Sequence, residues 1–292
     1  TIADFCYTLN LTGTFNGNYT AENYSRIAPI NKNYGTMSNL DISATIDISQ
    51  QSKYIEASGL CNYNYGSIKD SKSYVNLHAP VASAYVDEND GTIDNCTSDG
   101  FVTGRACDKE IDVSASGIAA FNKSNGKIIN STSNAYCHVS CGDGYHGYSA
   151  GVCFMNYGLI KNCSADGEIS MSGYSGDSNQ IFMAASGICD YNYKDIENCV
   201  FAGILLSNDT GSSSLSLSGI AALNDTDART IDCSYVPKYS NPIRFSVSTG
   251  TIYVAGVLTY NFGTCSGSYC SISSVDKLST ATVYFSNSIL YN

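Results

Sequence analysis

The chain has 292 residues, of which 43% are hydrophobic and 14% charged, and its formal net charge is −11. The hydrophobic content predicts a folded core rather than disorder. The acidic balance argues against a nucleic-acid partner, because phosphate binding requires a basic face. No run of about 18 apolar residues occurs, so we predict no membrane span.

The first segment, residues 1–27, lies outside the repeat described next and carries three Asn-x-Ser/Thr sequons, at Asn10, Asn18 and Asn23. We expect it to be an N-terminal cap or a subunit contact. The chain begins at Thr1 with no Met and no signal peptide, which fits a mature, processed protein and fits a trimmed chain equally.

Residues 28–278 contain one motif many times. Ser58–Asp70, Ala150–Asn162 and Ser186–Asn198 share a small residue, a Gly, an aliphatic residue, an Asn six residues after the start, and then an Ile before Asn or Asp. Looser copies begin at Ser116, Ser218 and Ala255. Two degenerate copies surround Asn33 and Asn89. The repeat therefore supplies eight anchor asparagines: Asn33, Asn64, Asn89, Asn122, Asn156, Asn192, Asn224 and Asn261.

Each period of the repeat holds about three strand-like pieces and no helical pattern. In the fifth period they are expected around residues 150–155, 167–171 and 181–185. Short strands repeated at this period predict an all-β parallel β-helix (β-solenoid) of about eight coils with about three strands per coil. A β-propeller is the alternative, but its blades need four strands and about 40–45 residues.

The anchor asparagines have a structural explanation in such a fold. Equivalent residues of successive coils stack about 4.8 Å apart. An Asn tolerates turn geometry and can hydrogen-bond to the Asn of the next coil. We therefore expect the eight anchors to form one column.

The motif resembles the GLUG repeat of large surface and secreted proteins. The resemblance covers about residues 28–271 and is most specific at Cys163, Cys199 and Cys233, each of which follows Asn or Asp. The chain lacks the second Gly of the GLUG core. The resemblance implies a β-helix-like surface protein or adhesin, and it supplies no catalytic residues.

The chain has 13 cysteines, a number that favours an oxidising compartment. Stacked coils bring equivalent cysteines close together, so we expect disulfides among some of Cys96, Cys153, Cys163, Cys189, Cys199 and Cys233. No pairing is assigned. Two pairs of cysteines are close in the sequence, Cys137/Cys141 and Cys265/Cys270. Neither has a second cysteine pair or a His at zinc-finger spacing, so we predict no metal site and no cofactor.

Sequons favour passage through a glycosylating pathway. Asn10, Asn18, Asn23 and Asn208 lie outside the anchors and are the best candidates for a glycan. Asn95, Asn130 and Asn162 lie near coil turns and are the next-best candidates for a glycan. Asn122 and Asn224 are anchors, where a buried side chain could not carry a sugar.

Few residues suggest catalysis. The acid pairs Asp108/Glu110 and Asp166/Glu168 could each share one strand face, as a glycosidase requires, but solvated positions explain them more simply. Asp87, Glu88 and Asp90 are assigned to a solvated turn and depart from calcium-loop spacing. The sequence shows no Ser-His-acid or Cys-His pattern around the three His residues. We therefore predict no catalytic residues and no enzymatic activity.

Three features favour partners. Tyrosines recur beside the anchors, where they would stack on sugars, pack a neighbouring chain or be half-buried at the coil corners. The strand before each anchor is apolar on both faces, so a loop or another subunit is expected to cover it. Residues 279–292 are β-prone and uncharged, and they would either complete the last coil or pair with a neighbouring subunit.

These observations predict a secreted, extracellular structural or adhesive glycoprotein, with a self-assembling fibre subunit as one form. Its partners would be other copies, bound through the solenoid ends or the apolar face, and glycans. The alternative is a secreted carbohydrate-active enzyme, a polysaccharide lyase or glycosidase, on the same scaffold.

Overall fold

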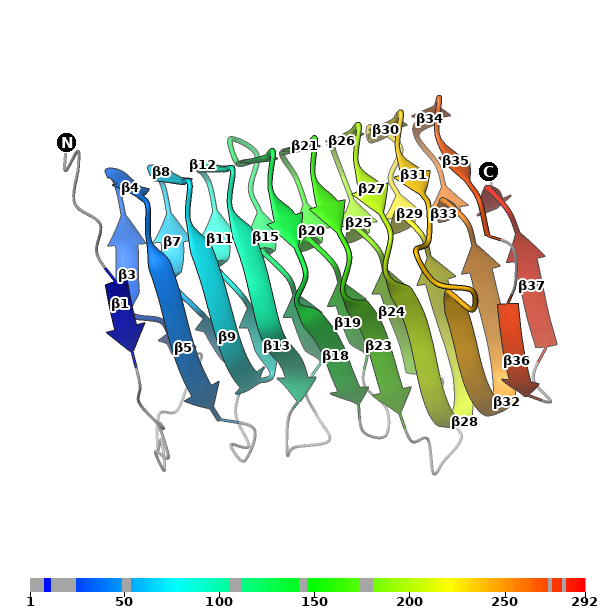
Figure 1. Ribbon diagram of the computed structural model, residues 1–292. Helices are drawn as coiled ribbons and strands as arrows, with labels where there is room; N and C mark the ends of the chain where they lie inside the picture. Colours follow the sequence, from blue (N-terminus) through cyan, green and yellow to red (C-terminus); the bar gives the residue numbers. More distant parts are fainter. Residues whose placement is uncertain are drawn as a thin grey trace.

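The computed structural model describes residues 8–11, 25–48, 54–105, 112–141, 146–173, 181–272, 275–279 and 282–291. These residues form a parallel β-solenoid, as the repeat predicts, with β1 (Thr8–Leu11) near one end of the stack and β37 (Thr282–Ser286) at the other (Figure 1). All strand pairings between coils are parallel in the described ranges. Within them, no helix is long and apolar enough to cross a membrane.

Sheet B contains the anchors and has nine strands of three or four residues. They are β3 (Ile30–Asn33), β7 (Cys61–Asn64), β11 (Val86–Asn89), β15 (Ala119–Asn122), β20 (Cys153–Asn156), β25 (Cys189–Asn192), β29 (Ala221–Asn224), β33 (Leu258–Asn261) and β38 (Ile289–Tyr291).

Sheet C follows the turn after each anchor and has eight strands. They are β4 (Thr36–Ser38), β8 (Ser67–Lys69), β12 (Thr92–Asp94), β16 (Lys127–Ile129), β21 (Leu159–Lys161), β26 (Asp195–Glu197), β30 (Arg229–Ile231) and β34 (Thr264–Ser266).

Sheet A is the largest, with 21 strands. Its long strands lie side by side in Figure 1: β1 (Thr8–Leu11), β5 (Asp41–Asp47), β9 (Lys72–Ala79), β13 (Thr97–Arg105), β18 (Tyr136–Cys141), β23 (Glu168–Gly173), β28 (Ile204–Ser218), β32 (Ile243–Ala255) and β36 (Val275–Ser279).

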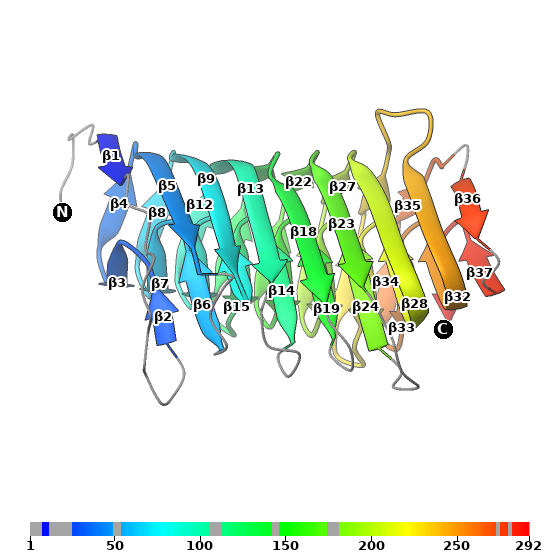
Figure 2. The same cartoon turned by 90° about the horizontal axis from the view of Figure 1, so that it is seen from below.

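Shorter pieces of sheet A lie before and after the long strands (Figure 2). Those that lead into sheet B are β2 (Ser25–Ile27), β6 (Ile55–Ser58), β10 (Val81–Ser83), β14 (Val113–Ser116), β19 (Gly147–Ala150), β24 (Ile181–Ser186) and β37 (Thr282–Ser286). Two-residue strands follow sheet C: β17 (Thr132–Ser133), β22 (Ser164–Ala165), β27 (Val200–Phe201), β31 (Ser234–Tyr235) and β35 (Tyr269–Cys270).

The number of turns and of strands per turn follows from these sheets. The eight anchors delimit about seven full turns. In the fifth period the predicted pieces correspond to β20, β23 and β24, but the coil also contains β21 and β22. Those two strands have only two or three residues each, which is too short to show the alternating pattern that identifies a strand in a sequence.

The interior is a stack of apolar side chains, one set from each coil. Ile68, Ile93, Ile128 and Ile160 from sheet C are fully buried and pair in register. The repeat Gly is required where the chain bends from sheet A into sheet B. At Gly187, an added Cβ would lie 2.1 Å from the carbonyl oxygen of Gly219 and 2.3 Å from the Phe201 ring. Only Gly fits such a close approach.

Both end segments continue the sheets. β1 pairs with β5, and β2 pairs with β6, although residues 1–7 and 12–24 lie outside the described residues. At the other end, β37 pairs with β32, and β38 pairs with β33. Of the two outcomes expected for residues 279–292, the structure has the segment completing the last coil of its own chain.

Candidate functional site

The anchor asparagines form one buried ladder. Each side-chain amide Nδ2 donates to Oδ1 of the next anchor over 2.7–2.8 Å, from Asn33 to Asn261. From Asn64 to Asn224 these side chains have no exposed surface. The same Nδ2 groups also approach backbone carbonyls, as Asn156 Nδ2 does to Asp195 O over 3.1 Å. The ladder therefore joins coils and is closed to ligands.

A second, exposed ladder follows sheet C. Its residues have a left-handed backbone with φ of 49–56°, a conformation that Asn and Asp tolerate. Asn162 Nδ2 donates to Asn130 Oδ1 over 3.1 Å, and Asn198 Nδ2 donates to Asn162 Oδ1 over 2.8 Å. The members are Asn39, Asp70, Asn95, Asn130, Asn162, Asn198 and Asp232. This column was not predicted from the sequence, although an Asn or Asp after each sheet C strand was its signal.

The predicted glycosylation sites divide by exposure. Asn95, Asn130, Asn162 and Asn208 are exposed, whereas Asn122 and Asn224 are buried in the anchor ladder. Asn10 lies in β1, where it pairs with Ser43. Asn18 and Asn23 lie outside the described residues.

The six disulfide candidates are buried free thiols rather than disulfides. The structure places five of them as neighbours: Cys153 pairs with Cys189, and Cys163, Cys199 and Cys233 follow one another in the coils. In a parallel, in-register pair the Cβ atoms point the same way about 4.8 Å apart, while a disulfide needs about 3.8 Å. The stacked thiols nevertheless interact directly, Cys153 with Cys189 and Cys199 with Cys163 and Cys233, so a disulfide within either group stays a prediction. Burial raises the pKa of the Cys96 thiol to about 11.

The apolar outer face of the strand before each anchor is covered in part by the same chain. Ala120, Phe154 and Ala222 are at most 6% exposed. Phe154 of β20 lies with its ring centroid 4.8 Å from that of Tyr148 in β19, which belongs to sheet A of the same coil. Phe121, Tyr191 and Leu223 of the same strands stay partly exposed, so contact of this face with a second subunit stays a prediction.

The corner also buries an acidic cluster near the first coils. Arg26 contacts the Glu56 carboxylate, lies 2.7 Å from Asp87 Oδ2 and 2.5 Å from Glu88 Oε1, and its guanidinium is 4.4 Å from the Tyr63 ring centroid. Asp87 was assigned to a solvated turn, and this is wrong: it is 1% exposed. Burial, and then the neighbouring Glu56, raise the pKa of Asp87. The cluster is structural, because both Glu56 and Asp87 are inaccessible.

The other acids and the histidine considered as catalytic candidates contact neighbouring side chains where the structure describes them. Asp166 forms an ion pair with Lys238 over 2.5 Å. The pKa of Glu168 is raised, because the effect of burial exceeds the opposing effect of Arg244. Asp108 and Glu110 lie outside the described residues. His138 faces Ser170, with Nδ1 2.9 Å from its Oγ, while the adjacent Cys137 is in the core. No three His, Cys, Asp or Glu side chains in the described ranges are placed to hold a metal ion.

Tyrosines beside the anchors stack where neighbouring coils both carry one. The Tyr34 and Tyr65 rings are 5.0 Å apart at 11°, and the Tyr157 and Tyr193 rings are 4.6 Å apart at 2°. The column is interrupted by charged residues such as Asp90 and Lys123. A separate apolar hollow of about 320 Å³ lies at the corner, lined by Phe182, Tyr191, Ala222, Leu223, Tyr260 and Phe262.

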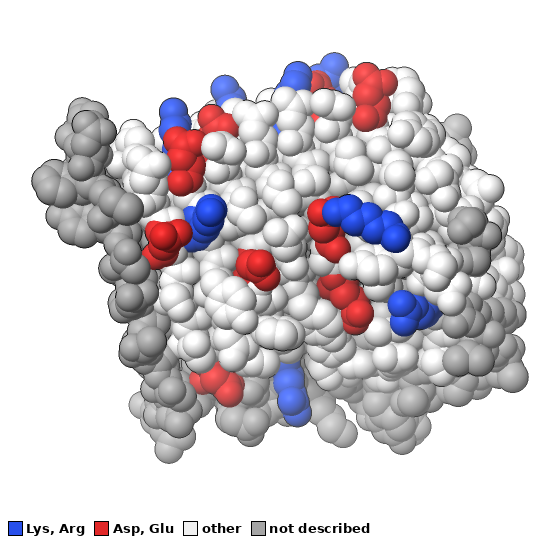
Figure 3. Space-filling model, in the orientation of Figure 1, with Lys and Arg blue, Asp and Glu red and all other residues white. Residues whose placement is uncertain are grey.

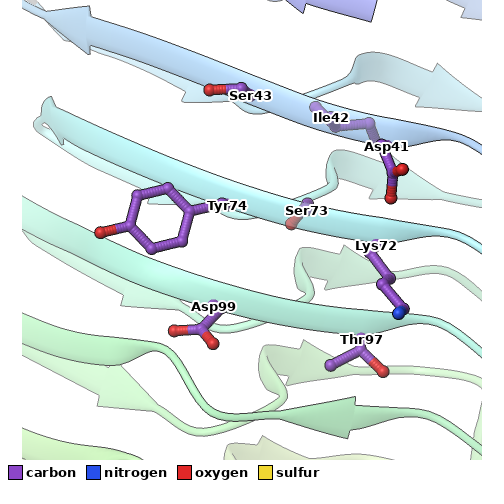
Figure 4. A pocket seen from close by; sticks show the side chains of 8 residues that line it. All are labelled: Asp41, Ile42, Ser43, Lys72, Ser73, Tyr74, Thr97 and Asp99. Atoms are coloured by element: carbon purple, nitrogen blue, oxygen red, sulfur yellow. The ribbon is translucent and has the colours of Figure 1, made fainter. Parts of the chain in front are cut away.

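Another hollow, here called the polar hollow after the Asp, Lys, Ser and Thr residues that line it, lies on the long strands of sheet A near the N-terminal end of the solenoid, and most of its exposed surface is apolar. Its volume is about 360 Å³, and its lining comes from β5, β9 and β13. Figure 4 shows two rows of side chains across these strands. The lining residues are Asp41, Ile42, Ser43, Lys72, Ser73, Tyr74, Thr97 and Asp99.

The parallel register produces the two rows. Asp41, Lys72 and Thr97 are partners across the three strands, and Ser43, Tyr74 and Asp99 are partners two residues further along. Because side chains alternate along a strand, both rows face the outside. The Tyr74 side chain is 58% exposed, which leaves a ring face open for contact. These residues lie outside the repeated motif, so the sequence pattern did not predict the hollow.

Aromatic residues continue from the hollow onto the next coils. Phe101 of β13 is 49% exposed and lies diagonally beside Tyr74 on the same face. Its ring centroid is 5.7 Å from that of Tyr136 in β18, which in turn is 5.9 Å from the His138 ring. Figure 3 shows that the face seen in Figure 1 is mostly uncharged, with scattered acidic and basic side chains.

Comparison of the chain with family models, with curated proteins and with solved structures finds no match.

Proposed function

We propose that the protein is a secreted, non-catalytic structural or adhesive protein whose solenoid displays a recognition surface on the long strands of sheet A. The observation that carries the proposal is the polar hollow together with the exposed Tyr74 and Phe101 and the half-buried Tyr136 beside it. A rigid stack of parallel strands holds these side chains at fixed spacing, which lowers the entropy lost on binding.

The distribution of the acids supports a recognition surface over an active site. Asp87 and Glu56 are buried against Arg26, and Asp166 is paired with Lys238. A glycosidase needs two carboxylates about 5–9.5 Å apart on one sugar. The two acids that line the hollow, Asp41 and Asp99, are on β5 and β13, two interstrand steps and two register positions apart, which separates their backbones by roughly 12 Å. The resemblance of the repeat to GLUG motifs of surface proteins and the exposed sequons support an extracellular location.

The location is tested on intact cells of the source organism with a membrane-impermeant biotin reagent. The proposal expects the native protein to be labelled, or to be recovered from the medium, and to lose mass when its N-glycans are removed enzymatically. An intracellular protein without glycans would contradict the proposal. Self-association through the solenoid ends remains a separate prediction, for which light scattering of the purified protein is the measurement.

A further inference from the structure

We propose that the polar hollow and the adjoining aromatic residues bind one neutral, extended oligosaccharide lying along the solenoid axis. This inference rests on the adhesive role proposed above and names the ligand class of that surface.

The side chains of the hollow match the groups of a sugar. Tyr74 offers an exposed ring face on which the C–H face of a pyranose can pack. The Asp99 and Asp41 carboxylates accept hydrogen bonds from hydroxyl groups, Lys72 donates them, and Thr97 does both. A volume of about 360 Å³ lies in the range of small-ligand pockets.

The orientation of the ligand follows from the order of the strands. Asp41, Tyr74, Phe101 and Tyr136 lie on β5, β9, β13 and β18, which are successive neighbours in sheet A. Three interstrand steps of about 4.8 Å place the first and last of these strands roughly 14 Å apart. The aromatic side chains therefore follow the axis and cross the strands, and a ligand that contacts all of them spans several sugar units.

The charge of the surface selects a neutral ligand. Two carboxylates and one ammonium group line the hollow, and the chain carries a formal net charge of −11. An acidic polysaccharide would be repelled by this field and would find a single cation in the hollow, Lys72.

The test measures binding of the purified full chain by isothermal titration calorimetry. The probes are cellohexaose and chitohexaose as neutral oligosaccharides, and hexagalacturonate as an acidic one. We expect saturable binding of at least one neutral probe and weaker or no binding of hexagalacturonate. Tyr74→Ala and Asp99→Asn should each weaken binding by about tenfold, the effect of losing one stacking contact or one charge-assisted hydrogen bond.

The matched control is Tyr239→Ala, which removes an exposed tyrosine in the loop before β32, several coils from the hollow. It should leave the affinity unchanged. Circular dichroism shows whether each variant is folded, and Tyr74→Phe, which keeps the ring, should retain most of the affinity. The inference is overturned if no neutral probe binds, if hexagalacturonate binds more tightly, or if Tyr74→Ala and Tyr239→Ala bind alike. Because binding is measured in vitro, such a failure is distinct from a failure of the protein to reach the cell surface.

Discussion

The Asn156 side chain donates a hydrogen bond from Nδ2 to Oδ1 of Asn192 over 2.8 Å, although the two residues are 36 positions apart in the sequence. Both are fully buried. The same contact recurs between every pair of successive anchors, so this one relationship describes how the coils are held in register.

Replacing Asn156 by Ala should destabilise the fold. The substitution removes the short acceptor of Asn122 Nδ2 and the side-chain donor to Asn192 Oδ1, and leaves both groups only contacts of 3.3 Å with backbone groups. An unsatisfied buried group costs about 1–3 kcal/mol. Urea unfolding followed by circular dichroism gives the change. Asn125→Ala, which removes an exposed amide, is the control and should change the free energy of unfolding by under about 0.5 kcal/mol. Equal effects for the two variants would contradict the ladder's role.

Replacing Arg26 by Met should be more costly, because it leaves the Glu56 and Asp87 carboxylates buried without their cation. Breaking a buried ion pair in this way costs about 3–5 kcal/mol. Lys161→Met is the comparison, since Lys161 pairs with Glu197 at the surface over 2.8 Å. Such a surface pair contributes about 0–1 kcal/mol. If thermal unfolding shows the two variants to be equally stable, the Arg26 cluster does not secure the first coils.

Asp190 makes stability depend on pH. It is fully buried, with the neutral Ser186 hydroxyl as a hydrogen-bonding neighbour of its carboxylate. Burial raises its pKa well above the ordinary value of 3.8. The folded state therefore holds this proton more tightly than the unfolded state. The contribution of the protonated Asp190 to the stability of the fold is complete below about pH 3.8. It is lost as the pH rises toward the pKa of Asp190 in the folded state.

Asp190→Asn removes this proton equilibrium. The variant should be more stable than the parent at pH 7 and should lose the advantage near pH 3. Asp227→Asn, at an exposed position, should follow the parent at every pH. Chemical unfolding measured across this pH range decides the point. An advantage of Asp190→Asn that is the same at pH 3 and pH 7 would show that proton release is not its cause.

Glycan occupancy should follow side-chain exposure. After expression in a glycosylating eukaryotic host, peptide mapping by mass spectrometry should find sugar at Asn208 and at one or more of Asn95, Asn130 and Asn162. No sugar should be found at Asn122 or Asn224, because both amides are buried and donate within the anchor ladder. Sugar at either anchor in folded material would mean that the column faces solvent.

The repeat made the solenoid predictable, because the same Gly, aliphatic residue and Asn recur wherever the chain bends and stacks. The buried position of Asp87 was not predictable. Its partners Arg26 and Glu56 are 61 and 31 residues away, and only the coil geometry brings them to the corner. The polar hollow was not predictable for the same reason, because only the stacking of the coils brings its residues together. Tyr74 and Asp99 are 25 positions apart, outside the motif, and the parallel register makes them neighbours.

The central claim is that the face of the long sheet A strands is the surface that contacts other molecules. The most direct test places a glycan on that face. Phe101→Asn creates a sequon with Thr103, at a side chain that is 49% exposed on β13. Tyr269→Asn creates one with Ser271, at a side chain that is 57% exposed on β35, and serves as the matched control.

Both variants are expressed in a glycosylating host, and their adhesion to cells or matrix of the source organism is compared with that of the parent. Mass spectrometry first establishes that each new site carries sugar. The account predicts that the glycan at position 101 abolishes adhesion and that the glycan at position 269 leaves it intact. Unchanged adhesion of the Phe101→Asn variant with its glycan in place would contradict the claim.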